Sequence, residues 1–206
     1  VVNVGVIARW DKIKNHKAVL TAAKYAKRNG LPLAFHSIVD IPNKKEYLRM
    51  EKEYERYVHV IGPQGRAKIS EFCSAVDVLF LPSLFDVSPT VVLESIATDT
   101  PIVISPNVGY VSDFTSNGGS EWVMDTARAK NITESLIRLA DKRMPTELIE
   151  KLIEKHDHQK VFGAYLAVFR SLIGFLGVYT DDTKLVKSPV RVEGSVSTPV
   201  GITPSK

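Results

Sequence analysis

Short apolar runs alternate with helix-forming segments along most of this chain, and this alternation is the feature that most limits its fold. Six runs have the length and the branched apolar content of buried parallel strands, the sixth more weakly than the others. Strands that alternate with helices favour a parallel sheet covered on both faces, with right-handed crossovers. The sequence therefore predicts an α/β, Rossmann-like, doubly wound parallel sheet. The predicted strands are residues 2–8, 33–39, 58–61, 78–81, 101–104 and 121–124.

The segments between the strands, and the carboxyl-terminal third of the chain, are predicted to be helical. The first helix begins after the N-cap candidate Asn15, and the second carries Tyr47, Met50 and Tyr54 at helical spacing as its inner face. We expect one domain with a helical carboxyl-terminal extension over residues 1–180, and a tail or linker over residues 181–206. The predicted helices are residues 16–28, 43–57, 67–75, 89–97, 127–142, 146–155 and 160–174.

Composition narrows the class of protein. A chain of 206 residues with 44% hydrophobic content can bury one good core. Its first residues form an apolar run with no charged leader, and its single cysteine, Cys73, excludes an internal disulfide, so we expect a cytoplasmic protein. The net charge of +4 is mild, and the basic clusters lack interleaved aromatic side chains, so no nucleic-acid partner is expected.

Two carboxyl-terminal features could indicate a metal or a membrane. His156-Asp157-His158 has no third ligand at metal-binding spacing, so we expect no metal site. Residues 161–179 contain only one charge, Arg170, and approach the length of a membrane span. A central arginine and three glycines disfavour spanning, and packing against another domain is the preferred interpretation. Peripheral membrane contact stays open as the alternative.

The segment from Asp77 to Glu94 is predicted to be a buried strand, a polar turn and the start of a helix. Ser88 suits an N-cap, and Pro89 suits the first helical position, where its missing N–H costs nothing. The free amides of Thr90 and Val91 would then point out of the carboxyl edge of the sheet, where open α/β folds bind anions. We therefore expect a ligand site at this edge.

Two carboxylates bracket this helix start. Glu94 is the only charged side chain between Val87 and Ala97, and a carboxylate among apolar residues needs hydrogen-bond partners such as ligand hydroxyls. Asp86 lies in the turn, where functional residues are common. The alternatives are a solvated Glu94 on the outer face of the helix and an Asp86 that only caps its own turn.

Two cations follow the first predicted strand. Arg9 and Lys14 fall in a loop that opens onto the same edge as Asp86. The planar fork of arginine and the point charge of lysine would neutralise two phosphates without a metal. The alternative is a pair of solvated surface cations. The sequence has no glycine-rich phosphate loop of the dinucleotide-binding or Walker type.

Five motifs resemble a known family, the retaining glycosyltransferases of the GT-B fold, in particular family 4. Asp86-Val-Ser-Pro-Thr-Val-Val-Leu-Glu94 resembles the E-x7-E segment of that family, and Arg9-Trp-Asp-Lys-Ile-Lys14-Asn-His resembles its first carboxyl-domain loop. The motifs stand in the family's order and approximate spacing, over about residues 2–142. The other three are Val60-Ile-Gly62, Ala75-Val-Asp-Val-Leu-Phe-Leu-Pro-Ser83 and Thr100-Pro-Ile-Val-Ile104.

The resemblance implies that the chain is the donor-binding half of a two-domain enzyme. It implies that Arg9 and Lys14 hold the diphosphate of a nucleotide sugar, that Glu94 binds the ribose hydroxyls, and that Asp86 contacts hydroxyls of the transferred sugar. It also implies a donor of UDP or GDP type, transfer with retention, and no metal or other cofactor. The acceptor site would belong to an amino-terminal domain that is absent from this chain.

The helix start and the third strand complete the implied site. The turn at Ser88 and Pro89 and the amides of Thr90 and Val91 would face the phosphate or the sugar. The base would lie near Ile61 and Gly62, which follow the third predicted strand.

The chain departs from the family pattern at several positions. Asp86 replaces the usual first glutamate, and Val87 stands where glycine is common. Asp99 replaces a usual glycine, and Asn107-Val-Gly-Tyr110 matches a later glycine-containing loop only in part. These departures bear on the identity of the sugar more than on the nucleotide site. Two other functions stay open: a non-catalytic glycan-binding or scaffold module, and a sugar-nucleotide epimerase.

Overall fold

The computed structural model describes residues 1–41, 44–48 and 51–175. The chain divides into two compact units, Val1–Lys160 and Val161–Lys206. The predicted boundary at residue 180 and the predicted tail over residues 181–206 lie outside the described residues.

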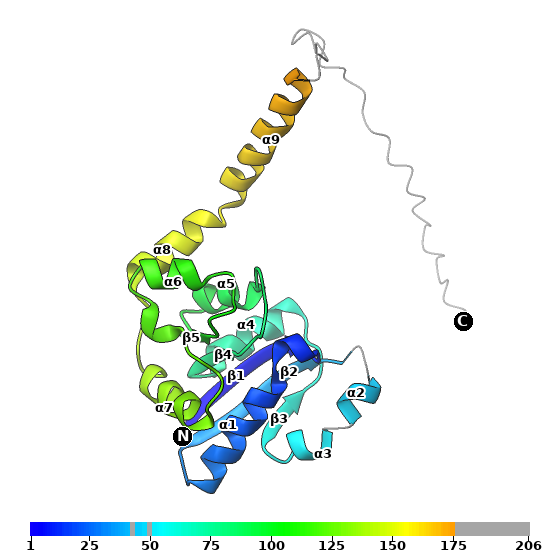
Figure 1. Cartoon of the computed structure of the whole chain (residues 1–206), viewed down its shortest axis with the longest axis vertical. Helices are drawn as coiled ribbons and strands as arrows, with labels where there is room; N and C mark the ends of the chain where they lie inside the picture. The colour runs from blue at the N-terminus through cyan, green and yellow to red at the C-terminus, as the bar shows by residue number, and fades with distance from the viewer. Residues whose placement is uncertain (42–43, 49–50, 176–206) are drawn as a thin grey trace, which may run out of the picture. The chain divides into compact units, whose positions relative to one another are not determined.

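Unit 1 is built on a five-stranded parallel sheet with the strand order β3-β2-β1-β4-β5 (Figure 1). The order reverses between β1 and β4, as in doubly wound α/β folds. The predicted α/β fold and its first five strands are confirmed, with ends that differ by at most one residue. The strands are β1 (Val2–Arg9), β2 (Leu33–Asp40), β3 (Val58–Ile61), β4 (Val78–Leu81) and β5 (Ile102–Ile104).

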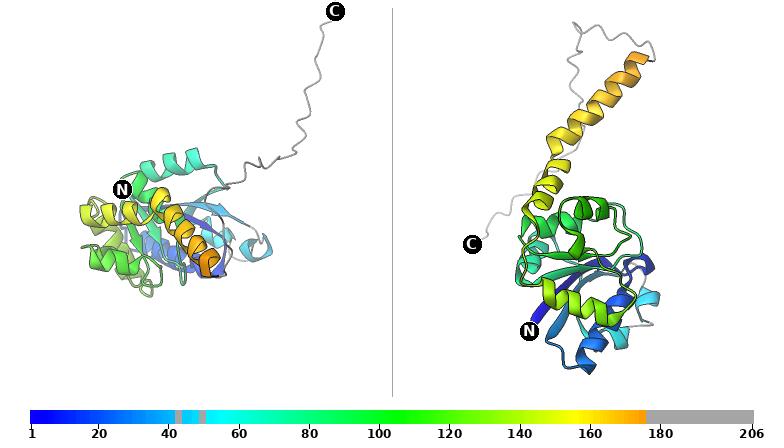
Figure 2. Two further views of the ribbon diagram at one scale, coloured as in Figure 1. Left: turned by 90° about the horizontal axis from the view of Figure 1, so that it is seen from above. Right: turned by 60° about the vertical axis from the view of Figure 1, so that its left-hand side comes forward.

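Helices cover both faces of this sheet (Figures 1 and 2). Helix α1 packs beside α7, and α4 packs beside α5. Right-handed crossovers on either side of the switch between β1 and β4 place these two pairs on opposite faces. The α-helices are α1 (His16–Arg28), α2 (Lys44–Leu48), α3 (Glu51–Tyr54), α4 (Arg66–Ala75), α5 (Thr90–Ala97), α6 (Val111–Ser116), α7 (Ala129–Leu139), α8 (Thr146–Lys155) and α9 (His158–Phe175), and the 3-10 helices are η1 (Lys12–Lys14) and η2 (Ser120–Trp122).

Strand β1 is the central strand of the sheet, and its sequence fits the packing on the sheet's faces. Val4 and Val6 are buried, with 0% and 2% of their surface exposed. Between them, Gly5 leaves room for side chains of α4 and the neighbouring strand β4: a Cβ atom there would lie 3.0 Å from Phe72 of α4 and 2.8 Å from Leu79 of β4. Residues of alternating size on one strand therefore let a helix approach closely on one face of the sheet.

Three features of the elements differ from the prediction. The helix predicted for residues 43–57 ends at Tyr54, and its described parts are α2 and α3. The sixth strand is absent, because η2 coils residues 120–122 and leaves only Val123 paired with Ile104. Helix α6 was not predicted. The predicted inner face is confirmed at Tyr47 and Tyr54, which are 4% and 0% exposed, whereas Met50 lies outside the described residues.

Cys73 is confirmed as a buried thiol. It is fully buried on α4, and burial raises its pKa to about 11. A thiol with so high a pKa forms little thiolate near neutral pH, so Cys73 has a packing role.

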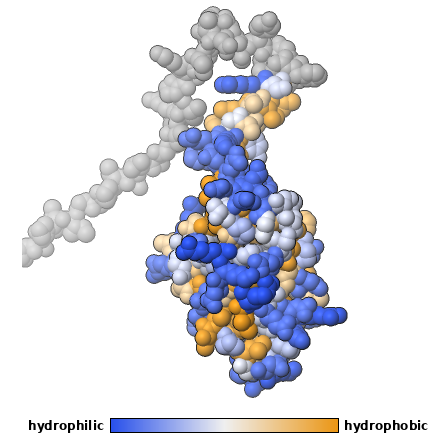
Figure 3. Space-filling model, turned by 90° about the vertical axis from the view of Figure 1, so that its left-hand side faces the viewer, coloured by the Kyte–Doolittle hydropathy of each residue, from blue (hydrophilic) through white to orange (hydrophobic). Residues whose placement is uncertain are grey.

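The described part of unit 2 is helical, as part of α9. Its large apolar side chains are exposed, and Figure 3 shows them as an orange surface near the top of the view. Within the described residues, none of the helices has the length and apolar character that crossing a membrane requires.

Candidate functional site

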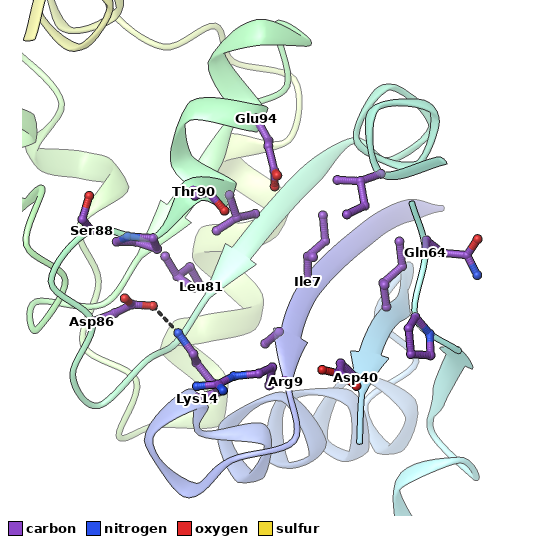
Figure 4. Close-up of a pocket in the computed structure, with 16 residues that line it drawn as sticks. Ile7, Arg9, Lys14, Asp40, Gln64, Leu81, Asp86, Ser88, Thr90 and Glu94 are labelled. Atoms are coloured by element: carbon purple, nitrogen blue, oxygen red, sulfur yellow. Dashed lines mark hydrogen bonds and ion pairs between the residues drawn. The ribbon is translucent and has the colours of Figure 1, made fainter. Parts of the chain in front are cut away.

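A cavity of about 490 Å3 opens at the carboxyl edge of the sheet, where the strand order reverses between β1 and β4 (Figure 4). This is the place at which open α/β sheets bind ligands. The structure brings eight of the ten predicted site residues to this cavity, from loops that lie far apart in the sequence. They are Arg9, Lys14, Asp86, Ser88, Pro89, Thr90, Val91 and Glu94.

The predicted cation Lys14 and the predicted acid Asp86 form an ion pair across the cavity wall (Figure 4). Their side chains are 18% and 14% exposed. Two charges so far removed from solvent are screened less than a surface pair. Neither side chain is therefore a solvated surface charge, and Asp86 does more than cap its own turn.

The predicted loop begins one residue later than expected, since Arg9 is the last residue of β1, and this end of the strand is anchored from behind by His16. The imidazole Nε2 donates a hydrogen bond to the Arg9 carbonyl at 2.9 Å, which leaves Nδ1 to accept from the Tyr54 hydroxyl at 3.2 Å. Trp10 stacks on the imidazole with a ring separation of 4.4 Å. His16 is only 4% exposed, and burial lowers its pKa. His16 therefore supports this segment as a neutral imidazole, and it does not line the cavity.

The β1–α1 and β4–α5 loops are also bonded to each other. The Leu84 amide donates to the Ile13 carbonyl at 2.7 Å, and the Asn15 side-chain amide donates to the Pro82 carbonyl at 3.1 Å. Asn15 is the N-cap residue of α1, as predicted, but its backbone is left-handed with φ 55° and its side chain makes no cap hydrogen bond, because it bonds between the loops. The two loops therefore position Lys14 and Asp86 as one unit.

The start of helix α5 differs from the prediction by one residue. Pro89 is the N-cap in an extended conformation and Thr90 is the first helical residue. Ser88 does not cap the helix, because its hydroxyl lies 3.1 Å from the hydroxyl of buried Tyr110. No side chain of the described residues caps the helix start, and Thr90 and Val91 in its first turn line the cavity. The first turn of the helix therefore lines the cavity as predicted, although the N-cap residue is Pro89 and not Ser88.

The backbone of Asp86 is fixed by the loop after β5. The Asp86 amide donates to the Asn107 carbonyl at 3.3 Å, and the Gly109 amide donates to the Asp86 carbonyl at 2.8 Å. A Cβ atom on Gly109 would lie 1.9 Å from the Val87 carbonyl oxygen, so only glycine allows this close approach. Gly109 therefore determines where the Asp86 side chain enters the cavity.

Glu94 lies on α5 and faces the same cavity (Figure 4). Burial raises the pKa of its carboxyl group, and the positive charge of Arg66 offsets part of this effect. A half-buried carboxylate that lines a cavity can accept hydrogen bonds from ligand hydroxyls.

The structure places the predicted base-binding residues beside the cavity rather than in it. Ile61 and Gly62 do not line the cavity, but the next two residues, Pro63 and Gln64, do. Asp40 also lines it and was not predicted. Because Asp40 ends β2 in register with Arg9, the rule that carboxyl ends of parallel strands share an edge could have identified it.

Comparison with known proteins agrees with this geometry. Residues 3–159 match the family model described as "Glycosyl transferases group 1". The chain belongs to this family. The glycosyl transferases group 1 match includes every residue that lines the cavity, from Ile7 to Glu94.

Individual members and solved structures cover most of this chain but only part of their own length. EpsF of Bacillus subtilis (strain 168) is 26% identical over 177 residues, which are 81% of this chain and 44% of EpsF. An α,α-trehalose-phosphate synthase (UDP-forming) from Burkholderia vietnamiensis superimposes with a TM-score of 0.69 at 16% identity, over 86% of this chain and 45% of the synthase.

A second solved structure is a trehalose-6-phosphate synthase described in work on glycosyl transfer with retention. It has a TM-score of 0.65 at 14% identity and covers 82% of this chain and 45% of its own. At this identity both solved structures support the fold alone, and that fold is one half of a GT-B glycosyltransferase. The chain spans about half the length of the curated relatives it matches.

Proposed function

We propose that this chain binds the donor of a retaining glycosyltransferase, a nucleoside diphosphate sugar. The observation that carries the proposal is the convergence of two cations, three carboxylates and an uncapped helix start on one cavity. Arg9 and Lys14 supply the positive charge that a diphosphate needs, and the first amides of α5 add the positive end of a helix dipole.

The carboxylates take the hydroxyl-bearing parts of the donor. Glu94 is half-buried on α5 and accepts hydrogen bonds from the ribose hydroxyls. Asp86 is next to Lys14 and accepts from hydroxyls of the sugar that leaves the diphosphate. When the bond between sugar and phosphate breaks, the two cations and the helix start stabilise the negative charge on the departing diphosphate. This stabilisation lowers the barrier without a metal ion.

The proposal assigns the acceptor site to another part of the enzyme. The curated relatives are about twice as long as the match, so the chain corresponds to about half of such a protein. A half that binds the donor can show nucleotide affinity without transfer, and binding is therefore the informative measurement. UDP and GDP are the expected nucleotides, and the UDP-forming synthase of the same fold supports the first.

A thermal-shift panel of UDP, GDP, ADP and their sugar nucleotides tests the proposal. Ligand at a hundredfold excess over its Kd stabilises the folded state by about 2.7 kcal/mol. Arg9→Ala should weaken both diphosphates and sugar nucleotides by about tenfold, because a charge-assisted contact to phosphate is lost. Arg143→Ala, which removes an exposed cation outside the cavity, should leave both affinities unchanged.

The other outcomes of the panel identify the alternatives. A panel without any shift, in the wild type and in Glu94→Ala alike, would favour the glycan-binding or scaffold module. Equal nucleotide affinity in Arg9→Ala and wild type would remove Arg9 from the site. A bound sugar nucleotide that is converted without any acceptor would favour the epimerase.

A further inference from the structure

The lysine assigned to the donor diphosphate is already paired with a carboxylate. Lys14 donates to Asp86, and both side chains line the cavity with less than a fifth of their surface exposed. An anion that reaches Lys14 therefore also lies beside Asp86. Because water screens this position weakly, the negative charge of Asp86 acts strongly on the bound anion.

The charge of the ligand changes at this position during the proposed reaction. In a nucleotide sugar the outer phosphate is bonded to the sugar and carries one negative charge. After the sugar has left, the outer phosphate is a terminal group, and terminal phosphates take a second negative charge with a pKa near 6. At pH 8 the free nucleoside diphosphate therefore carries one more negative charge than the donor. The additional charge is on the outer phosphate, which keeps the oxygen that had been bonded to the sugar.

We propose that Asp86 makes the cavity select the donor over the product by charge. The inference rests on the proposed function. Toward the donor, the Asp86 carboxylate is a hydrogen-bond acceptor for sugar hydroxyls. Toward the free diphosphate, it is a like charge beside a terminal phosphate, which weakens binding. The same residue thus favours donor binding and product release.

Two further features support this role. The Asp86 backbone is held by Asn107 and Gly109, so the carboxylate cannot withdraw from the cavity by a movement of its loop alone. The other charges that line the cavity are Arg9, Asp40 and Glu94, and none of them is paired with Lys14 within the described residues. Asp86 is therefore the carboxylate that most directly opposes a charge increase at the outer phosphate.

The test separates charge from sugar contacts by using three kinds of ligand. These are the free diphosphates UDP, GDP and ADP, their β-methyl esters, and UDP-glucose, GDP-mannose and ADP-glucose. The methyl ester has the charge of the donor but no sugar. Isothermal titration at pH 8 gives the affinity ratio of methyl ester to free diphosphate, for the base that binds.

In the wild type, the methyl ester should bind more tightly than the free diphosphate. In Asp86→Asn, the free diphosphate should gain about tenfold relative to the methyl ester, and the sugar nucleotide should lose affinity. Asp86→Glu keeps the charge and should keep the wild-type ratio. Asp99→Asn removes one charge from an exposed position outside the cavity, where asparagine tolerates the positive φ of 51°, and should not change the ratio.

The possible results distinguish a failure of this inference from a failure of the proposed function. An unchanged ratio in Asp86→Asn, with nucleotides still bound, overturns the charge-selection role and leaves the proposed function standing. A changed ratio in Asp99→Asn as large as in Asp86→Asn would show that net charge alone is responsible, which also overturns it. If none of the three diphosphates binds to any variant, the proposed function fails and this inference fails with it.

Discussion

The two loops that form the cavity are held in place by different parts of the molecule. The β1–α1 loop carries Lys14 and directly follows Arg9, the last residue of β1. This cationic loop is anchored by buried side chains, since Trp10 and His16 behind it are 5% and 4% exposed. The β4–α5 loop carries Asp86 and is held through its backbone by residues 107 and 109. On either side of Asp86, Phe85 and Val87 are 63% and 68% exposed.

This difference indicates which side of the cavity can vary. A change behind the cationic loop disturbs the core and lowers the stability of the fold. A change in an exposed side chain of the acidic loop, such as Phe85 or Val87, leaves the core intact. Of the departures from the family pattern, Asp86 and Val87 lie in the acidic loop and Asn107-Val-Gly-Tyr110 supports it, whereas Asp99 follows the end of α5. In the proposed function, the cationic side would bind the diphosphate that all such donors share, and the acidic side would contact the sugar, which varies.

The largest expected effect comes from the support of the acidic loop. Gly109→Ala places a methyl group 1.9 Å from the Val87 carbonyl oxygen, so the two loops must separate. We expect a stability loss of about 3 kcal/mol and a sugar-nucleotide affinity at least about tenfold lower. Chemical unfolding and isothermal titration measure the two quantities.

A matched glycine checks that the effect comes from this contact. Gly163 lies in a helix, and a Cβ atom there would meet no other part of the chain within 4 Å, so Gly163→Ala should be neutral or slightly stabilising. If Gly109→Ala weakened the binding of free diphosphate as much as the binding of sugar nucleotide, the substitution would also have altered the cationic loop. The proposed difference between the two loops would then be wrong.

The next effect tests the anchor of the cationic loop. Tyr54→Phe removes the hydroxyl that His16 Nδ1 accepts from and leaves a buried acceptor without a partner. The expected cost is about 1–2 kcal/mol of unfolding free energy. Tyr165→Phe, at a site that is 62% exposed, should cost less than about 0.5 kcal/mol. Equal stability of the two variants would show that the His16 anchor contributes nothing.

The smallest effect concerns Glu94, which lines the cavity from α5. Burial raises its pKa, so on acidification it is protonated at a higher pH than an ordinary glutamate. A protonated carboxyl is a weaker acceptor for ribose hydroxyls, so sugar-nucleotide affinity should fall as the pH is lowered from about 7.5 to about 5. We expect a decrease about threefold larger than in Glu94→Gln, measured by titration at each pH. Parallel pH profiles would contradict the ribose role.

The sequence predicted the sheet more reliably than the ends of its helices. Each of the five strands is a short apolar run, and burial on both faces of a parallel sheet requires such a run, so pattern and structure coincide. Ser88 is not the N-cap of α5, and Asn15 is the N-cap of α1 without a side-chain cap bond, because their side chains bond to Tyr110 and Pro82, which are distant in the sequence. A local pattern cannot show that a distant group will compete for a capping side chain.

The sequence alone determined the fold class and the residues that carry charge to the carboxyl edge, because hydrophobic periodicity and strand ends are local properties. Only the tertiary structure decided how those residues face each other. The pairing of Lys14 with Asp86, the anchoring of Arg9 through His16, and the place of Asp40 and Gln64 in the cavity all depend on contacts between segments far apart in the chain. Such contacts follow from strand order and close packing, and neither can be obtained from the spacing of residues along one segment.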